Sequence, residues 1–407
     1  MKRFLKNYGF TLLLLAGIIA GAVCGLVFGE KASVVRPLGD FFLNMMFVLV
    51  VPLVFFSMAT AFCNMKRSGT IVRTLGVSVL VFVIMSFLTG ALTYGGVLLW
   101  KPLDTSALPE MPTLLSGERG ESFSFGDTLV QALTVPDFLS LFDKSHLLPL
   151  ILFSSLLGYA VALLRQRGEK VAAALQTGLD ITVTMVKLVM YLAPVCLGCY
   201  IADIIGRLGG AVADGYMRIV VQYIILTVIV FFGLYSILVF AARGRKGLKA
   251  FWTHIHTPAL TAMASCSSAA CIPMGIEAAK RMGVKPQVAE SVIPLGTNLH
   301  KDGSVIGSFL KIAFVMSLYG MPYQSVGQFF LYMGIALLVG CVMGAVPTGG
   351  MTGELLICAM LGFPPEMAAS LMIIGTLVDM PATLVNVTAN VTAAVWIDRL
   401  TAISRRR

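Results

Sequence analysis

Long apolar runs dominate this chain, and short polar clusters separate them. Six runs of roughly twenty residues or more come first, with approximate ranges Tyr8–Phe28, Pro37–Cys63, Val72–Trp100, His146–Leu164, Leu175–Ile205 and Met217–Ala242. A helix needs about 20 apolar residues to cross a bilayer. The pattern therefore predicts six consecutive membrane-spanning helices.

The pattern changes after Arg245. Two moderately apolar segments, Phe251–Met274 and Phe329–Phe363, have centres made of small, polar or helix-breaking residues. Basic clusters flank the first segment at both ends, so its ends should face the same side of the membrane. We predict that both segments are re-entrant hairpins, followed by the spans Val288–Leu318 and Ala368–Ile397. Two opposed hairpins of this kind are typical of inverted-repeat secondary transporters with a midplane site.

Composition and charge agree with a membrane protein. The chain is 57% hydrophobic and 12% charged, with a mean hydropathy of +0.89, whereas a soluble domain carries about 25% charged residues. The net charge of +10 lies in short clusters between apolar runs, as in cytoplasmic loops. We therefore expect a multi-pass protein of the cytoplasmic membrane, in contact with lipid, with both termini cytoplasmic and with no nucleic-acid partner.

Two minor signals have simple interpretations. Only Cys196 and Cys199, among eight cysteines, have a C-x-x-C spacing. We interpret them as small packing residues in a helix, not as a zinc or redox site. Lys2 and Arg3 precede the apolar run Phe10–Phe28, which is too long for a signal peptide and predicts a retained first helix.

Three consecutive ionisable residues, His300, Lys301 and Asp302, lie in the middle of the run Val288–Leu318. A charge at this depth costs at least about 2.5–3.5 kcal/mol, so such residues usually face protein or a watery cavity. Helix-breaking residues lie beside them: Pro294, Gly296 and Gly303. We predict an interrupted helix whose freed carbonyl groups can bind a cation.

Four motifs in order identify a family. They are the serine-rich tip Ser265–Ser268, a Pro-Leu-Gly run at Pro294 ending in Asp302-Gly303, the Val346-Pro347 tip, and Asp379 with Thr383, Asn386 and Val387. With these motifs the chain resembles the dicarboxylate/amino acid:cation symporters, which include glutamate and neutral amino acid transporters. The resemblance covers essentially the whole chain. It implies an all-α integral membrane fold: eight transmembrane helices plus two opposed re-entrant hairpins, in a homotrimer that works as an inverted-repeat elevator transporter.

The resemblance also implies a division of the chain. Residues 1–71 (helices 1 and 2) and 146–214 (helices 4 and 5) would form a fixed scaffold. Residues 72–101 (helix 3) and 215–407 (helix 6, hairpin 1, helix 7, hairpin 2 and helix 8) would form the moving transport domain. Residues 102–145 would form an extracellular loop.

The implied substrate site centres on the last helix. Asp379 matches the residue that holds the substrate's ammonium group, and Thr383, Asn386 and Asn390 follow it on one helical face. The substrate-binding residues that the resemblance implies are Ser267, Ser268, Ser304, Val346, Pro347, Gly350, Asp379, Thr383 and Asn386.

Two departures from the family pattern bear on the substrate. Ala382 stands where the family has an arginine that grips a second carboxylate, and Gly375 stands where an acid supports that arginine. Alanine cannot replace bidentate recognition by arginine. We therefore expect a small neutral amino acid as substrate, in preference to a dicarboxylate.

The chain also departs from the family pattern at residues linked to ion coupling. The residues expected to take part are Gly296, Asn298, His300, Lys301, Asp302 and Asn390. Our hypothesis is that the Lys301 ammonium occupies a sodium position, which reduces or removes sodium dependence, and that His300 helps to couple transport to protons. In the alternative, Lys301 snorkels to water and His300 is a packed, neutral residue. If sodium does bind, we expect Gly296, Asn386 and Asp302 around it. No cofactor is expected apart from a coupling ion, sodium or proton.

Three other functions stay open. The chain could be a sodium-coupled symporter of serine, threonine and alanine or of dicarboxylates, or an anion channel. An intramembrane enzyme would need a nucleophile such as Ser267 or Ser268 with Lys301, but no catalytic motif supports one. Glu354, inside the second hairpin, has no assigned role.

Overall fold

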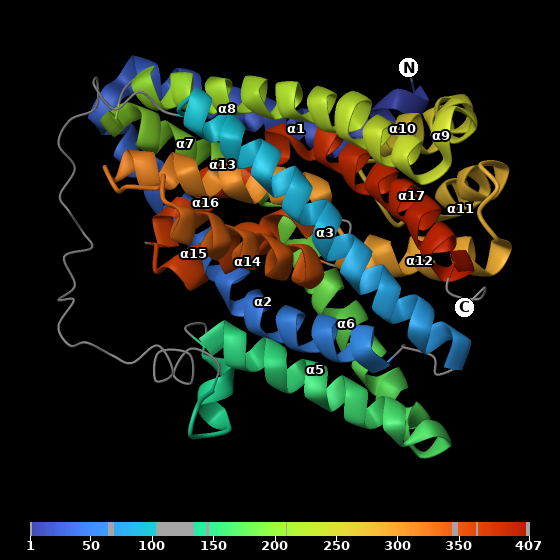
Figure 1. Cartoon of the computed structure of the whole chain (residues 1–407). Helices are drawn as coiled ribbons and strands as arrows, with labels where there is room; N and C mark the ends of the chain where they lie inside the picture. Colours follow the sequence, from blue (N-terminus) through green and yellow to red (C-terminus); the bar gives the residue numbers. More distant parts are fainter. Residues whose placement is uncertain are drawn as a thin grey trace.

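The computed structural model describes residues 2–63, 69–102, 134–143, 146–208, 210–343, 349–363 and 365–403. These residues form an all-helical bundle without a strand (Figure 1). Six helical stretches among them are long and apolar enough to cross a membrane. The all-α membrane class is therefore confirmed. The full count of spans and the elevator mechanism stay predictions.

The first half of the chain supplies the long outer helices. Their bounds are α1 Lys2–Phe28, α2 Arg36–Cys63, α3 Gly69–Leu99, α5 Leu147–Leu163, α6 Glu169–Met190, α7 Ala193–Leu208 and α8 Gly210–Val228. Short 3-10 turns occupy Gly29–Val35, Leu139–Phe142 and Arg165–Gly168. A π-helical turn, Ile229–Leu234, joins α8 to α9.

The second half consists of shorter pieces. Their bounds are α9 Tyr235–His254, α10 His256–Ser265, α11 Ile272–Arg281, α12 Pro286–Leu299, α13 Asp302–Leu318, α14 Val326–Met343, α15 Gly349–Leu361, α16 Pro365–Leu377 and α17 Asp379–Ile403. Almost all of α13 and most of α17 are buried. These two helices form the centre of the second half, and they carry most of the candidate site.

The helices pack in two groups. In the first group α1 packs against α7, and α2 packs against α5, α6 and α7. In the second group α17 packs against α10, α11, α12 and α13, while α3 packs against α13 and α17. The 1–71/146–214 and 72–101/215–407 division stays a prediction, because packing alone does not show which group moves.

The first group is held by close backbone contact. A methyl group built on Gly21 of α1 would collide with the carbonyl of Gly198 in α7, and Gly17 faces Pro194 in the same way. Small residues let helices approach closely where lipid, not water, surrounds them. The Cys196–Cys199 pair lies on this helix as free thiols, which agrees with a packing role.

Both expected hairpins contain two helical arms. The first is α10 and α11, joined by residues 266–271, where Cys266 takes the left-handed conformation (φ 48°) that ends α10. The second is α14 and α15, whose expected tip residues Val346 and Pro347 lie outside the described residues. Gly350 is the second residue of α15. The re-entrant character of the hairpins stays a prediction, because membrane depth is not recorded.

Several expected boundaries were wrong. The fifth run is two helices, α6 and α7, because the chain turns just before Pro194, which lacks the amide hydrogen that a helix interior needs. The sixth continues into α9 beyond Ala242, with a kink at Gly244 (φ 63°), so Phe251 belongs to α9 and not to the first hairpin. Helix α8 begins at Gly210, so the expected boundary after Asp214 falls inside a helix.

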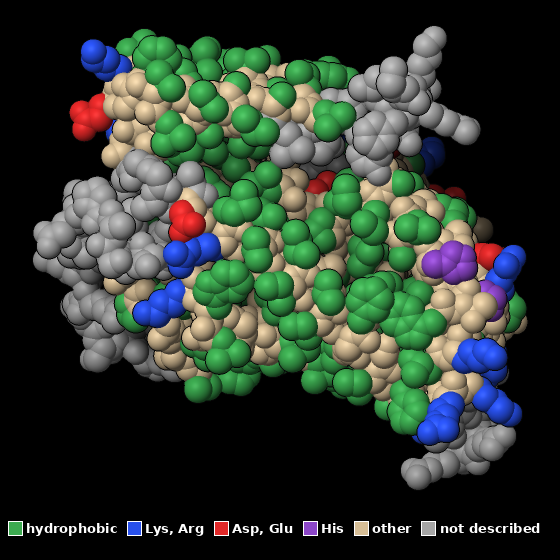
Figure 2. All heavy atoms as spheres, turned by 90° about the horizontal axis from the view of Figure 1, so that it is seen from above, with side chains coloured by type: hydrophobic (Ala, Val, Ile, Leu, Met, Phe, Trp, Pro, Cys, Tyr) green, Lys and Arg blue, Asp and Glu red, His purple; other side chains and the backbone are tan. Residues whose placement is uncertain are grey.

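Hydrophobic side chains cover the outside of the molecule. Figure 2 shows a face on which they fill the middle, while Lys and Arg side chains gather mainly near its edges. Large exposed residues such as Leu156 and Leu188 lie on helices of the first group. This distribution is what a lipid environment requires. The chain begins and ends at the same end of the bundle (Figure 1); which side of the membrane this end faces stays a prediction.

Candidate functional site

The predicted helix interruption is present, two residues earlier than Gly303. Helix α12 ends at Leu299 and α13 begins at Asp302. Between them His300 is extended (φ −126°, ψ 109°) and Lys301 is non-helical (φ −137°, ψ 79°). The backbone amide of Gly303 donates a 2.9 Å hydrogen bond to Oδ1 of Asn386, which ties the start of α13 to α17. The break therefore places three ionisable side chains beside the last helix.

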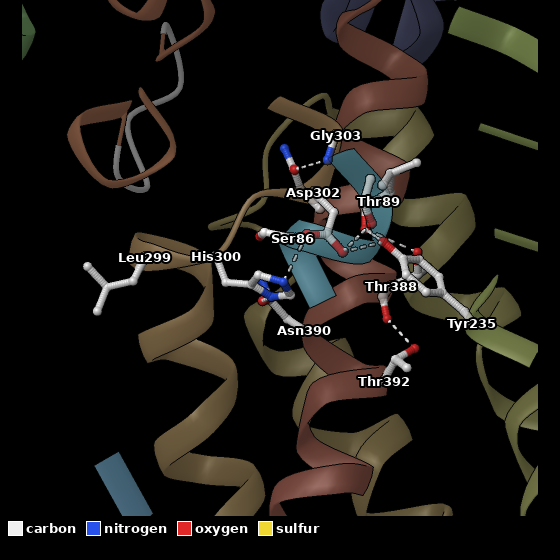
Figure 3. A network of polar contacts seen from close by, with 12 residues as sticks. Ser86, Thr89, Tyr235, Leu299, His300, Asp302, Gly303, Thr388, Asn390 and Thr392 are labelled. Carbon is white, nitrogen blue, oxygen red and sulfur yellow. Dashed lines mark hydrogen bonds and ion pairs between the residues drawn. The ribbon is translucent and has the colours of Figure 1, made fainter. Parts of the chain in front are cut away.

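Asp302 is completely buried and surrounded by hydrogen-bond donors (Figure 3). Ser86 and Thr89 of α3 donate to it at 2.9 and 3.1 Å, and Tyr235 of α9 donates at 3.1 Å. A buried carboxylate is costly unless such partners surround it. Asp302 therefore joins three helices of the second group into one polar centre.

His300 lies between Asp302 and Asn390. Its Nε2 is 3.0 Å from Oδ1 of Asp302, and its Nδ1 is 3.0 Å from Oδ1 of Asn390. The ring stacks on Phe82, with 4.6 Å between ring centroids. The Nδ1 contact is a hydrogen bond, whereas Nε2 lies at ion-pair distance from Asp302 and has no hydrogen-bond partner among the described residues. Protein atoms thus fill the space between the two oxygens.

Lys301 forms no ion pair with Asp302 among the described residues. The partners of Asp302 are Ser86, Thr89, Tyr235 and His300. Lys301 is 6% exposed and is within electrostatic range of Asp379. The ionisable side chain beside Asp302 is therefore that of His300. The expected membrane depth marked both His300 and Lys301 as unusual, but it could not tell which of them lies beside Asp302.

A cavity of about 40 Å³ lies between α8, α13 and the helices of the second hairpin and last span. Three predicted substrate residues line it together: Ser304, Asp379 and Asn386. Ala382 and Gly375, the two departures from the family pattern, line the same space. The volume has room for a few water molecules. This is the candidate substrate site.

Asp379 is the first residue of α17, after a one-residue interruption of the helix at Val378. Backbone hydrogen bonds from Val378 to Ile374 (3.1 Å) and from Ala382 to Val378 (2.9 Å) continue across this turn, within the expected span Ala368–Ile397. The Asp379 carboxylate has no hydrogen bond or ion pair within the described ranges. An acid in this environment is available to a cationic ligand group.

Two further charged residues line the cavity. Lys311 of α13 and Glu354 of α15 form an ion pair in which their side chains are 9% and 1% exposed. A methyl group on Gly375 would lie 2.5 Å from Oε1 of Glu354 and 3.2 Å from Nζ of Lys311. The absence of a side chain at Gly375 therefore makes room for the Lys311–Glu354 pair.

Other predicted residues lie apart from the cavity. Thr383 is buried on α17 but does not line the cavity. Ser267 and Ser268 belong to the first hairpin tip, where the neighbouring Cys266 thiol is within electrostatic range of Asp379. Asn298 donates to the carbonyl of Pro294 inside α12. Gly296 faces Asn390 and Phe82, so it belongs with His300.

Sequence reasoning missed four residues. Lys311 had a clear signal, since it is a second lysine in the apolar run Val288–Leu318. Thr89, Tyr223 and Tyr235 had none, because hydroxyl groups are common in membrane helices. The hydroxyl of Tyr223 donates to the carbonyl of Gly303 at 2.6 Å. A group of three or more His, Cys, Asp or Glu residues suited to a metal does not occur in the described part of the chain.

Comparison with known proteins gives a consistent result. The family model for the sodium:dicarboxylate symporter family matches residues 10–400. A C4-dicarboxylate transport protein of Rhodospirillum rubrum is 26% identical over 83% of this chain and 75% of its own length. A proton/glutamate-aspartate symporter of Bacillus subtilis is 24% identical, over 95% and 93%. Neutral amino acid transporter A of Bos taurus is 22% identical, over 94% and 81%.

Proposed function

Because the chain belongs to the sodium:dicarboxylate symporter family, we propose that it carries a small neutral amino acid across the cytoplasmic membrane by secondary active transport. The family makes it a multi-pass membrane transporter of dicarboxylates or amino acids, and not an enzyme. The neutral substrate is our inference. The observation that carries it is the cavity in which Asp379 has no described partner while Ala382 offers no cation.

The cavity's charges favour a zwitterion. Asp379 would accept the substrate's ammonium group, an interaction strengthened by the low dielectric of a buried site. Asn386 and Ser304 line the same space and offer neutral hydrogen-bonding groups to the α-carboxylate. A dicarboxylate would meet two carboxylates, Asp379 and Glu354, and like charges at short range repel strongly in such a site.

A dicarboxylate is the second candidate, and one observation favours it. Lys311 is a cation that lines the cavity, so it could hold a second carboxylate if Glu354 released it. Breaking a buried ion pair is costly because it leaves a charge uncompensated. The cost of separating Lys311 from Glu354 is the reason that we place this candidate second.

We further propose that transport needs little or no sodium. Asp302 already accepts hydrogen bonds from Ser86, Thr89 and Tyr235, and the His300 ring bridges Asp302 and Asn390. Oxygens engaged in this way are less available to a sodium ion, which takes oxygen ligands. A proton exchanged at His300 would then be the coupling ion in place of sodium. In this proposal Lys301 contributes positive charge near Asp379.

The mechanism and assembly are proposed by analogy with the family. The group formed by α3 and α8–α17 would move as an elevator against a scaffold of α1, α2 and α5–α7, in a homotrimer. Packing that is denser within the two helix groups than between them supports this division, and the lipid-type surface supports a membrane location. Basic clusters at Lys2–Lys6 and Arg405–Arg407 support cytoplasmic termini.

A ligand screen tests the proposed function. Purified full-length protein should gain several degrees of thermal stability from serine or alanine in choline buffer, since a ligand that binds only the folded state stabilises it. Succinate and glutamate should give no such gain. Stabilisation by a dicarboxylate alone would refute the neutral substrate. A gain that needs sodium would refute the sodium-independent part and leave the substrate proposal intact.

A further inference from the structure

The Lys311–Glu354 pair is an unusual feature of the cavity. Both side chains are buried, and they belong to different helices, α13 and α15. A buried ion pair is seldom a net gain in stability, since apolar residues of similar volume often serve as well or better. Stability alone therefore does not account for this pair, and its position at the cavity indicates a role in binding.

One atom of the pair is incompletely satisfied. Oε1 of Glu354 accepts from Lys311, but Oε2 is buried and has no hydrogen-bond partner among the residues that the structure describes. Leaving a buried charged acceptor unsatisfied is expensive. Because Glu354 lines the cavity, a ligand with a hydrogen-bond donor could supply the missing partner.

The surroundings restrict what that ligand group can be. Lys311 supplies donors and Glu354 supplies an acceptor, whereas Val339, Met343 and Ile357 make the wall beside them apolar. A hydroxyl or carboxamide can both donate and accept. An apolar side chain has no hydrogen-bond donor or acceptor, and a carboxylate would be repelled by the carboxylate of Glu354.

We propose that Lys311 and Glu354 form the subsite for the substrate's side chain and select neutral amino acids with a hydroxyl or carboxamide group. The assignment rests on the proposed function, in which Asp379 holds the ammonium group of the same molecule. Gly375 is part of this subsite, because any larger residue would displace the pair. Side-chain selection thus relies on two residues outside the motifs that identified the family.

Matched ligands test the subsite in the unmodified protein. Serine should bind roughly 10-fold to 100-fold more tightly than alanine, because alanine leaves Oε2 of Glu354 unsatisfied. Asparagine should likewise exceed leucine, its apolar isostere. Calorimetric titration of the full-length protein in detergent measures both ratios. Equal affinity within each pair would refute the subsite while leaving the neutral-substrate proposal standing; no binding of any neutral amino acid would refute that earlier proposal.

A double variant adds an independent test. Lys311→Met with Glu354→Leu removes the pair without leaving one charge unpaired, so the protein should fold. Its serine-to-alanine affinity ratio should fall to about threefold or less, with alanine binding retained. The matched control is Lys280→Met with Glu290→Leu, which removes an exposed ion pair between α11 and α12 and should leave the ratio unchanged. An unchanged serine-to-alanine affinity ratio in the variant without Lys311 and Glu354 would contradict the proposal.

Discussion

Replacing Asp379 with asparagine should lower the affinity for serine and alanine by about 100-fold or more. The substitution keeps the shape of the side chain and removes the charge that would hold the substrate's ammonium. Losing one partner of a buried charge pair typically costs several kcal/mol of binding. Calorimetry and uptake into proteoliposomes should both report the loss, because uptake requires the same binding step.

The same variant separates the two candidate substrates by the direction of the change. If the substrate were a dicarboxylate, removing a negative charge from the cavity would leave its affinity unchanged or raise it. The control is Glu277→Gln, which neutralises an exposed acid in α11 that pairs with Arg281. This control should change neither the affinity for serine or alanine nor the affinity for a dicarboxylate. Unaltered serine binding in Asp379→Asn would contradict the substrate site proposed here.

Replacing His300 with asparagine should create a sodium response. The smaller side chain removes the ring that bridges Asp302 and Asn390, and it adds a carbonyl oxygen to theirs. The new oxygen cluster resembles the ligands that hard cations prefer. We expect sodium to raise the unfolding temperature of the variant by several degrees relative to choline, while it has little effect on the parent protein.

Two companion variants test whether His300 or another residue controls the response to sodium. Lys301→Met should change cation dependence more than substrate selectivity. Its effect should be smaller than that of His300→Asn, since His300, and not Lys301, is the described residue of the two that pairs with Asp302. His256→Asn, an exposed histidine in α10, should change nothing. A parent protein that sodium stabilises as strongly as the His300 variant would contradict the account of a replaced sodium site.

Much of the fold could be predicted because a membrane restricts the choices. The long apolar runs and the basic clusters between them identified the helices, since lipid leaves few alternatives to a helix. The boundaries were less accurate where a proline or glycine broke a run. Pro194 divides one expected helix, and Gly244 kinks another.

The candidate site was predicted in part. Asp379 and Asn386 could be placed together because they share a helical face. The pairing of Lys311 with Glu354 could not, because it depends on how the second hairpin folds back beside α13. Likewise the sequence pointed to Lys301 as the residue at a sodium position, whereas the break between α12 and α13 places the His300 ring beside Asp302.

Uptake of labelled serine by proteoliposomes tests the central claim most directly. The protein would be reconstituted in full length, with choline replacing sodium on both sides, and uptake would be followed with and without an inward proton gradient. We predict that serine enters without sodium, that the proton gradient drives its accumulation, and that unlabelled succinate does not compete. Uptake that requires sodium, ignores the proton gradient and is blocked by succinate would contradict the account.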